Sequence, residues 1–296
     1  MNNIKKYSVI GEGIVLVDYG PITMTLEAKR QGSPFTEAAI TGAEKAIEVF
    51  NDLALYLDII RKPVSEIVDI PVCAPEAVKK MVNSVRMLNE PDFTPLAAVA
   101  GTVSDIAVEE ISRSGSDFAM ANNGGDIAWR VSEIGRESIR AALISDIKFG
   151  NKTHSLEIQS FREIRGIATS GMGGRSLTRG IASAVTVLAE NSSMADAAAT
   201  SIANACFCDD PAIVQCLAEE LDYSTDIKGL LVTKYVGALK EESVSDALLS
   251  GKKRAEFLLK FGMIRGAVIF VSGEMAVVGD RDTQRCLFEV KKLDQK

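Results

Sequence analysis

Histidine is nearly absent from this chain, because its 296 residues contain only His154. Zinc sites with several histidine ligands, and mechanisms in which two histidines exchange protons, are therefore excluded by counting. Aromatic residues are also scarce, at 6% of the chain, and no apolar run reaches the roughly 18 residues that a membrane span needs. Carboxylates, hydroxyls, thiols or backbone groups must therefore carry most of any chemistry.

The chain also has no excess of basic residues. Lys and Arg number 33 against 40 Asp and Glu, which gives a formal net charge of −7. Proteins that bind nucleic acid or anionic membranes usually present a basic face, so we expect neither partner. The opening residues, MNNIKKYSVIGEG, contain no apolar run of signal-peptide length, and we expect a cytoplasmic protein. Apolar residues make up 47% of the chain, enough for a sizeable core.

The five cysteines include no CxxC pair, which favours reduced thiols over a disulfide framework. Cys73 and Cys286 are isolated, whereas Cys206, Cys208 and Cys216 lie close together in the sequence. These three are either buried small apolar side chains or reactive thiols. The second interpretation predicts a cytosolic sulfur-assimilation or persulfide-handling protein, and it requires a lowered thiol pKa.

Hydrophobic periodicity predicts an α+β fold. Alternating apolar residues indicate strands over 9–19 and 22–26, and a helical period follows from Thr36, a candidate N-cap, until Pro63. Further helices are expected over 76–88, 96–111 and 194–206, and Ser192 or Ser193 is the expected N-cap of the last one. Further strands are expected over 118–121, 126–131, 139–147, 154–161, 184–189, 267–271 and 275–278. Because strands and helices do not alternate as βαβ units, we expect antiparallel sheets flanked by helices. Residues 1–296 would form one unit, or two closely packed α+β halves.

The first candidate site is the segment Asn122-Asn123-Gly124-Gly125-Asp126. Asn and Gly tolerate positive φ angles, so the segment predicts a tight hairpin turn. Its glycines would also let a phosphate approach backbone N–H groups. Both interpretations are open at this point.

The second candidate site is the pair Asp196 and Thr200, which lie four residues apart in a helical pattern and therefore on one face. A carboxylate and a hydroxyl are hard oxygen donors that suit Mg²⁺. Alternatively, Asp196 lies in the first turn of its own helix and is stabilised there by the helix dipole. The third candidate, Thr169-Ser170-Gly171, is either a phosphate-binding loop or a flexible surface loop.

Four segments taken in order resemble the motifs of the ApbE-like superfamily, whose best-known members are FAD:protein FMN transferases. They are the small-residue helix at 98–109, Asn122-x-Gly124-Gly125-Asp126, Thr169-Ser170-Gly171 and Ala195-Asp196-Ala197-Ala198-Ala199-Thr200. The resemblance covers roughly residues 95–205. It implies an ApbE-like (T-fold-like) α+β fold and a small cytosolic branch of that superfamily.

The resemblance also implies the ligands. Mg²⁺ would be bound by Asp196, Thr200 and a backbone carbonyl near Val103, and would bridge the pyrophosphate of FAD. The nucleotide would contact Asn122, Gly124, Gly125, Asp126, Thr169, Ser170 and Gly171. FMN would pass to a threonine of an acceptor protein as AMP leaves, and a second copy of the chain is a further expected partner.

The chain departs from the transferases at two places, and no catalytic residue is assigned. Ser104 and Asp105 occupy positions where the transferases have a lysine and a glycine, and residues 175–180 replace their His–Asp–Pro segment. Three functions follow as hypotheses. They are Mg²⁺-dependent binding of a flavin nucleotide or related pyrophosphate with FMN transfer, sulfur handling by the cysteines, and a binding module without catalysis.

Overall fold

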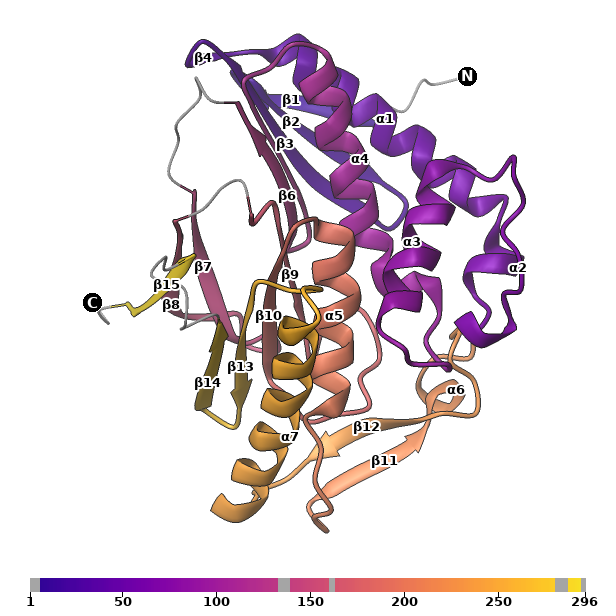
Figure 1. Ribbon diagram of the computed structural model, residues 1–296, viewed down its shortest axis with the longest axis vertical. Coiled ribbons are helices and arrows are strands. Elements are labelled where there is room, and N and C mark those ends of the chain that lie inside the picture. Colours follow the sequence, from indigo (N-terminus) through magenta and orange to yellow (C-terminus); the bar gives the residue numbers. More distant parts are fainter. Residues whose placement is uncertain (1–5, 133–138, 160–162, 280–286, 294–296) are drawn as a thin grey trace.

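A large antiparallel sheet forms the centre of the computed structural model, which describes residues 6–132, 139–159, 163–279 and 287–293. Its strand order is β1-β2-β3-β5-β6-β9-β10-β13-β14, and β4 pairs with β3 (Figure 1). The strands are β1 (Tyr7–Gly11), β2 (Ile14–Tyr19), β3 (Ile22–Arg30), β4 (Ser33–Pro34), β5 (Phe118–Asn123), β6 (Asp126–Val131), β9 (Gly166–Ser170), β10 (Ala184–Ala189), β13 (Gly266–Val271) and β14 (Glu274–Gly279). The α+β class with antiparallel sheets is therefore confirmed.

Four long helices cover one face of this sheet. Helix α1 packs on β2 and β3, α4 on β5 and β6, α5 on β9 and β10, and α7 on β13 and β14 (Figure 1). The helical segments are α1 (Thr36–Ala54), α2 (Leu57–Ile60), η1 (Val64–Glu66), α3 (Glu76–Met87), η2 (Pro95–Ala98), α4 (Val99–Arg113), α5 (Ser192–Ala205), α6 (Ala218–Leu221) and α7 (Glu241–Lys260). Within the described ranges, no helix combines the length and apolarity needed to cross a membrane.

The chain repeats one order of elements, two strands, then helices, then two strands. The first unit contains β2, β3, α1, α4, β5 and β6, and the second contains β9, β10, α5, α7, β13 and β14. The two units share one continuous sheet because β6 pairs with β9 through Ile127↔Ile167 and Ala128↔Gly166. The junction between them lies where α4 and α5 pack side by side.

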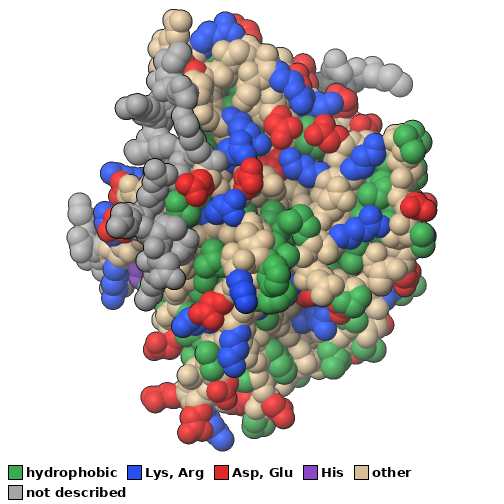
Figure 2. Space-filling model, in the orientation of Figure 1, with side chains coloured by type: hydrophobic (Ala, Val, Ile, Leu, Met, Phe, Trp, Pro, Cys, Tyr) green, Lys and Arg blue, Asp and Glu red, His purple; other side chains and the backbone are tan. Residues whose placement is uncertain are grey.

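A second, smaller sheet covers part of the other face. Its order is β15-β8-β7, made of β7 (Ile139–Asp146), β8 (Asn151–Ile158) and β15 (Phe288–Lys292). Trp129 and Phe270 are fully buried between the two sheets. A separate two-stranded ribbon, β11 (Ile213–Leu217) with β12 (Leu231–Val236), is drawn beneath α5 at the lower end of the view in Figure 1. Figure 2 shows acidic and basic side chains interspersed over the face drawn.

Four of the expected boundaries and caps differ from the structure as follows. The helix predicted from Thr36 to Pro63 ends at Ala54, because the chain turns there through hydrogen bonds from Leu55 and Tyr56 back to α1, and α2 is separate. Thr36 does not cap α1, since its Oγ1 accepts from the amide of Gly13 at 2.9 Å.

The N-cap of α5 is also different from the expected one. It is Asn191, whose side chain accepts from the amide of Met194, and not Ser192 or Ser193. The strand expected over 154–161 is β8, which spans Asn151–Ile158, and residues 160–161 lie outside the described part of the chain.

Candidate functional site

A cavity of about 990 Å³ lies at the junction of the two units. It is lined by every residue that the sequence singled out for ligand or metal binding, namely Val103, Asn122, Gly124, Gly125, Asp126, Thr169, Ser170, Gly171, Asp196 and Thr200. These residues come from α4, the β5–β6 turn, the end of β9 and α5. The structure therefore brings together four segments that are spread over about a hundred residues of sequence.

The β5–β6 connection is the expected tight hairpin turn, and it also faces the cavity. Gly124 and Gly125 have φ angles of +68° and +111°, which L side chains rarely adopt. The amide of Gly125 donates to Oδ1 of Asn122 at 2.9 Å, which closes the turn. A Cβ at Gly124 would come within 3.1 Å of a guanidinium nitrogen of Arg175, so Arg175 lies directly against this turn.

Asp126 follows the turn and is held from two sides. Its Oδ1 accepts from the amide of Thr169 at 3.3 Å, and its carbonyl accepts from Oγ of Ser104 at 2.9 Å. Burial raises the pKa of the Asp126 carboxyl to about 7, against the lowering effects of the Thr169 hydrogen bond and the positive charge of Arg175. Ser104 therefore joins α4 to the turn.

Asp196 lies beyond the first turn of α5, so its expected role at the start of its own helix is wrong. Its Oδ2 instead accepts from the amide of Gly101, at the start of α4, at 3.0 Å. Burial raises the pKa of Asp196 well above its ordinary value, and the neighbouring negative charge of Asp126 raises it further. The close approach of α4 and α5 requires Gly101, since a Cβ there would lie 2.2 Å from the carbonyl oxygen of Ser192.

Thr169 and Ser170 belong to strand β9, so the expectation of a flexible surface loop is wrong for them. The Oγ1 atoms of Thr169 and Thr186 are 2.9 Å apart, and the amide of Thr169 is already bonded to Asp126. Gly171 follows at a φ of +144°, where a Cβ would lie 2.9 Å from the carbonyl oxygen of Ala182. This segment therefore forms a rigid wall of the cavity.

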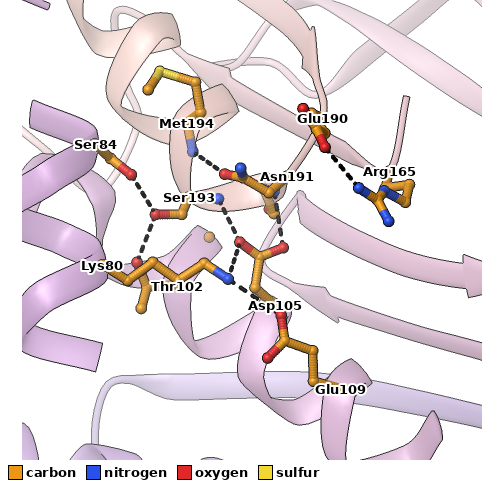
Figure 3. A network of polar contacts seen from close by, with 12 residues as sticks. Lys80, Ser84, Thr102, Asp105, Glu109, Arg165, Glu190, Asn191, Ser193 and Met194 are labelled. Atoms are coloured by element: carbon orange, nitrogen blue, oxygen red, sulfur yellow. Dashed lines mark hydrogen bonds and ion pairs between the residues drawn. The ribbon is translucent and has the colours of Figure 1, made fainter. Parts of the chain in front are cut away.

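Asp105, the departure noted in the first motif, has a structural explanation (Figure 3). Its carboxylate is completely buried and accepts from the amides of Ser192 and Ser193 at 2.9 and 3.0 Å. It also pairs with Lys80, whose Nζ lies 3.3 Å away. Burial raises the pKa of Asp105, while Lys80 and the two amides lower it. Asp105 therefore anchors the start of α5 to α4.

The oxygen donors around the cavity suit a hard divalent cation. No three His, Cys, Asp or Glu side chains form a metal-binding cluster among the residues that the structure describes. The cavity nevertheless holds the carboxylates of Asp126 and Asp196, the hydroxyl of Thr200 and the amide of Asn123. Val103 lies in the second turn of α4. Its carbonyl oxygen there accepts a hydrogen bond of the helix with one lone pair and keeps a second lone pair. Such a set fits Mg²⁺ that keeps waters and takes ligand phosphates.

Sequence reasoning missed two features of this site. Asn123 was assigned only to the turn, although its place in a hairpin opposite Asp126 could have indicated a shared face. The three basic side chains that line the cavity, Arg140, Lys152 and Arg175, come from segments that carried no motif. Only the fold brings them to the acidic groups.

Cys206 and Cys208 lack the lowered pKa that a reactive thiol requires. Cys206 is completely buried at the end of α5, and burial raises its pKa to about 12, so the expectation of a lowered pKa is wrong for it. Burial and nearby acidic residues also raise the pKa of Cys208. Cys216 lies on β11, and Cys286 is outside the described residues. His154 packs against Phe270 with ring centroids 5.5 Å apart.

Comparison with known proteins identifies relatives along most of the chain. A "UPF0280 protein" of Methanococcus vannielii is 38% identical over 184 residues, 62% of this chain and 72% of that protein. "UPF0280 protein MK0206" of Methanopyrus kandleri is 30% identical over 74% of this chain and 83% of its own length. The solved structure "Flavin Transferase ApbE from Vibrio cholerae" superposes with a TM-score of 0.38 and 13% identity, over 90% of this chain and 96% of that one. The sequence model described as "AbpE bacteria" matches residues 8–277, and the chain therefore belongs to that family, within the ApbE-like superfamily.

Proposed function

We propose that the cavity binds a flavin nucleotide such as FAD, or a related pyrophosphate ligand, together with Mg²⁺. The observation that carries this proposal is the convergence of all four motif segments on one cavity of about 990 Å³. Small-molecule sites usually span about 300–1,000 Å³, so this cavity can hold a large ligand. Family membership supports the same conclusion.

Asp196, Thr200 and the carbonyl near Val103 are the proposed metal ligands. The negative charges of Asp126 and Asp196 disfavour each other in the buried cavity, as the raised pKa of Asp196 indicates. A divalent cation beside them would remove this repulsion, because it favours the ionised form of both groups. When bound, Mg²⁺ would neutralise part of the pyrophosphate charge and stabilise AMP as a leaving group.

The remaining lining matches the other parts of such a ligand. Arg175, Lys152 and Arg140 supply positive charge for phosphate oxygens. Apolar side chains from α1, α2 and η2 line another part of the cavity, among them Phe50, Leu57 and Leu96. The cavity therefore offers basic side chains to the anionic part of such a ligand and apolar side chains to its apolar part.

FMN transfer is the activity we propose for this site. The hydroxyl oxygen of an acceptor threonine would bond to the FMN phosphorus, the bond to the AMP phosphate would break, and the hydroxyl proton would pass to Asp126. Burial raises the pKa of that carboxyl, which makes it a better proton acceptor than an ordinary aspartate. This assignment requires no histidine.

The test is incubation of the purified chain with FAD, Mg²⁺ and a threonine-bearing acceptor protein, with AMP release measured by chromatography. We expect AMP with the wild type, a loss of at least 100-fold with Asp196→Ala, and no loss with the exposed control Asp246→Ala on α7. If the wild type releases no AMP, and Asp196→Ala does not differ from it, the proposed FMN transfer is overturned. Mg²⁺-dependent FAD binding without AMP would instead support a binding module without catalysis.

A further inference from the structure

Asn123 carries a polar atom whose hydrogen bond is not made. The side chain is 5% exposed and lies at the end of β5, in the lining of the cavity. Its Oδ1 is enclosed by protein and has no hydrogen-bond partner among the residues that the structure describes. A buried acceptor left in this state is unfavourable, because it has lost its hydrogen bonds to water, so such atoms usually have a partner in the functional state of a protein.

The orientation of this amide is set by a neighbour. Nδ2 of Asn123 lies 3.5 Å from the carbonyl oxygen of Ala100, to which it donates. If the amide were flipped, its oxygen would face the carbonyl oxygen of Ala100, and this hydrogen bond would be lost. The free atom of Asn123 is therefore the oxygen.

Asn123 and Asp196 converge on the same point of helix α4. Asn123 binds the carbonyl of Ala100, and Asp196 accepts from the amide of the next residue, Gly101, at 3.0 Å. Asn123 also lies directly opposite Asp126 in the β5–β6 ladder. Side chains of such a pair share one face, with Cβ atoms about 5 Å apart.

Asn123 shares the cavity lining with the carboxylates of Asp126 and Asp196. Neither carboxylate donates a hydrogen bond when ionised. One cation placed among these oxygens would satisfy all of them at once, which a hydrogen-bond donor of ordinary size would not do. Amide oxygens are regular ligands of hard divalent cations.

We propose that Oδ1 of Asn123 is a further, uncharged ligand of the cation that Asp196 and Thr200 bind. The inference rests on the metal site of the proposed function, and it assigns to that site the residue at the variable position of the Asn122-x-Gly124-Gly125-Asp126 motif. Asn123 would thereby tie the cation to the end of β5, while Asp196 and Thr200 tie it to α5. The cation would join the two units of the sheet.

The experiment is titration of the full chain with Mn²⁺, followed by electron paramagnetic resonance of the free ion. Asn123→Leu removes the oxygen and keeps the shape, and we expect at least tenfold weaker Mn²⁺ binding. Asn123→Asp keeps an oxygen at the same place, and we expect binding at least as tight as in the wild type. The control Asn83→Leu makes the same change on an exposed face of α3 and should leave the affinity unchanged.

The outcomes separate this inference from the proposed function. If Asn123→Leu binds Mn²⁺ as the wild type does, while Asp196→Ala loses it, the role of Asn123 is overturned and the metal site stands. If the wild type and Asp196→Ala bind Mn²⁺ equally poorly, both proposals fail. If Asn123→Leu does not fold, the Tm of Asn123→Asp tests the inference instead. Mn²⁺ should raise the Tm of this variant more than it raises the Tm of the wild type. An equal or smaller rise overturns the inference.

Discussion

Asp105 and Asp196 each bind the start of the helix on which the other one lies. Asp105, on α4, accepts from the amides of Ser192 and Ser193 at the start of α5. Asp196, on α5, accepts from the amide of Gly101 near the start of α4. The first amides of a helix have no partner within it and favour negative charge. The two aspartates thus fix the relative position of the two helices that border the cavity.

We predict that Asp105→Ala lowers the free energy of unfolding by about 2–4 kcal/mol, because two buried amides lose their acceptor and Lys80 keeps only its ion pair with Glu109. Urea denaturation followed by circular dichroism measures the change. Glu110→Ala is the matched control, since this carboxylate lies on the same helix and pairs with the exposed Arg113. The control should change stability by less than about 1 kcal/mol. An Asp105→Ala variant as stable as the control would contradict the anchoring role.

The fold class and many of the elements could be predicted from sequence because they depend on local patterns, whereas strands β9, β11, β12 and β15 were not predicted. Alternating apolar residues and the Asn-Gly turn determined the β5–β6 hairpin, and helical spacing determined α4 and α5. The end of α1 could not be predicted in this way. Residues 55–62 continue the apolar spacing, whereas the chain turns at Leu55, so the helix ends before Pro63.

The residues of the candidate site could be predicted from motifs, but their hydrogen-bond and charge partners could not. Nothing in the local sequence shows that Asp105 binds the amides of residues 192 and 193, almost ninety positions away. The same holds for Arg175, which reaches the turn at Gly124 only through the loop after β9. These contacts depend on how the two units pack, and hydrophobic periodicity does not encode that packing.

Asp196→Asn should raise the stability of the metal-free protein while it weakens the binding of Mg²⁺. An amide oxygen can still accept from Gly101, and the unfavourable charge beside Asp126 is removed. We expect a Tm at pH 8 that is a few degrees higher without divalent ions, and at least tenfold weaker Mg²⁺ binding by calorimetry. Such opposite changes are typical of functional groups held at a cost in stability. If the Tm of Asp196→Asn without Mg²⁺ is lower than that of the wild type, the Asp196 carboxylate mainly stabilises the fold.

The raised pKa of Asp126 predicts a dependence of stability on pH. Its carboxyl titrates near 7 in the folded protein and near 3.8 in the unfolded chain, so between these values the folded state binds more protons. The free energy of unfolding should therefore fall as the pH rises from about 4 to 7, by at most about 1.4 kcal/mol per pH unit from this group. Asp126→Asn should reduce the slope, and Asp246→Asn should not. Denaturation of the metal-free protein between pH 5 and 8 measures both, and identical slopes in all three proteins would contradict the assignment.

Cys206 should resist modification in the native protein. Its thiol is buried and has a pKa of about 12, so almost none is ionised at pH 8. Cys73 is exposed and provides an internal control. Treatment with iodoacetamide followed by peptide mass spectrometry should label Cys73 in the folded protein and Cys206 only after unfolding. Rapid labelling of Cys206 in the folded protein would restore the sulfur-handling hypothesis.

Arg175 should contribute to the binding of anionic ligands. It lies against the turn at Gly124, and its charge acts on Asp126, yet the side chain is exposed at the cavity. One of its nitrogens donates to the carbonyl of Pro21 at 3.1 Å, which orients the guanidinium and leaves further N–H groups for a phosphate.

We therefore expect Arg175→Gln to weaken the binding of FAD in the presence of Mg²⁺ by about tenfold, which corresponds to about 1.4 kcal/mol. Added salt should weaken FAD binding less in this variant than in the wild type, because one charged contact is missing. Arg113→Gln removes the same charge from an exposed position on α4 and serves as the control. Fluorescence titration with FAD at two salt concentrations measures both effects. If Arg175→Gln and Arg113→Gln bind FAD alike, the ligand phosphates do not contact Arg175, and they must lie nearer to Lys152 and Arg140.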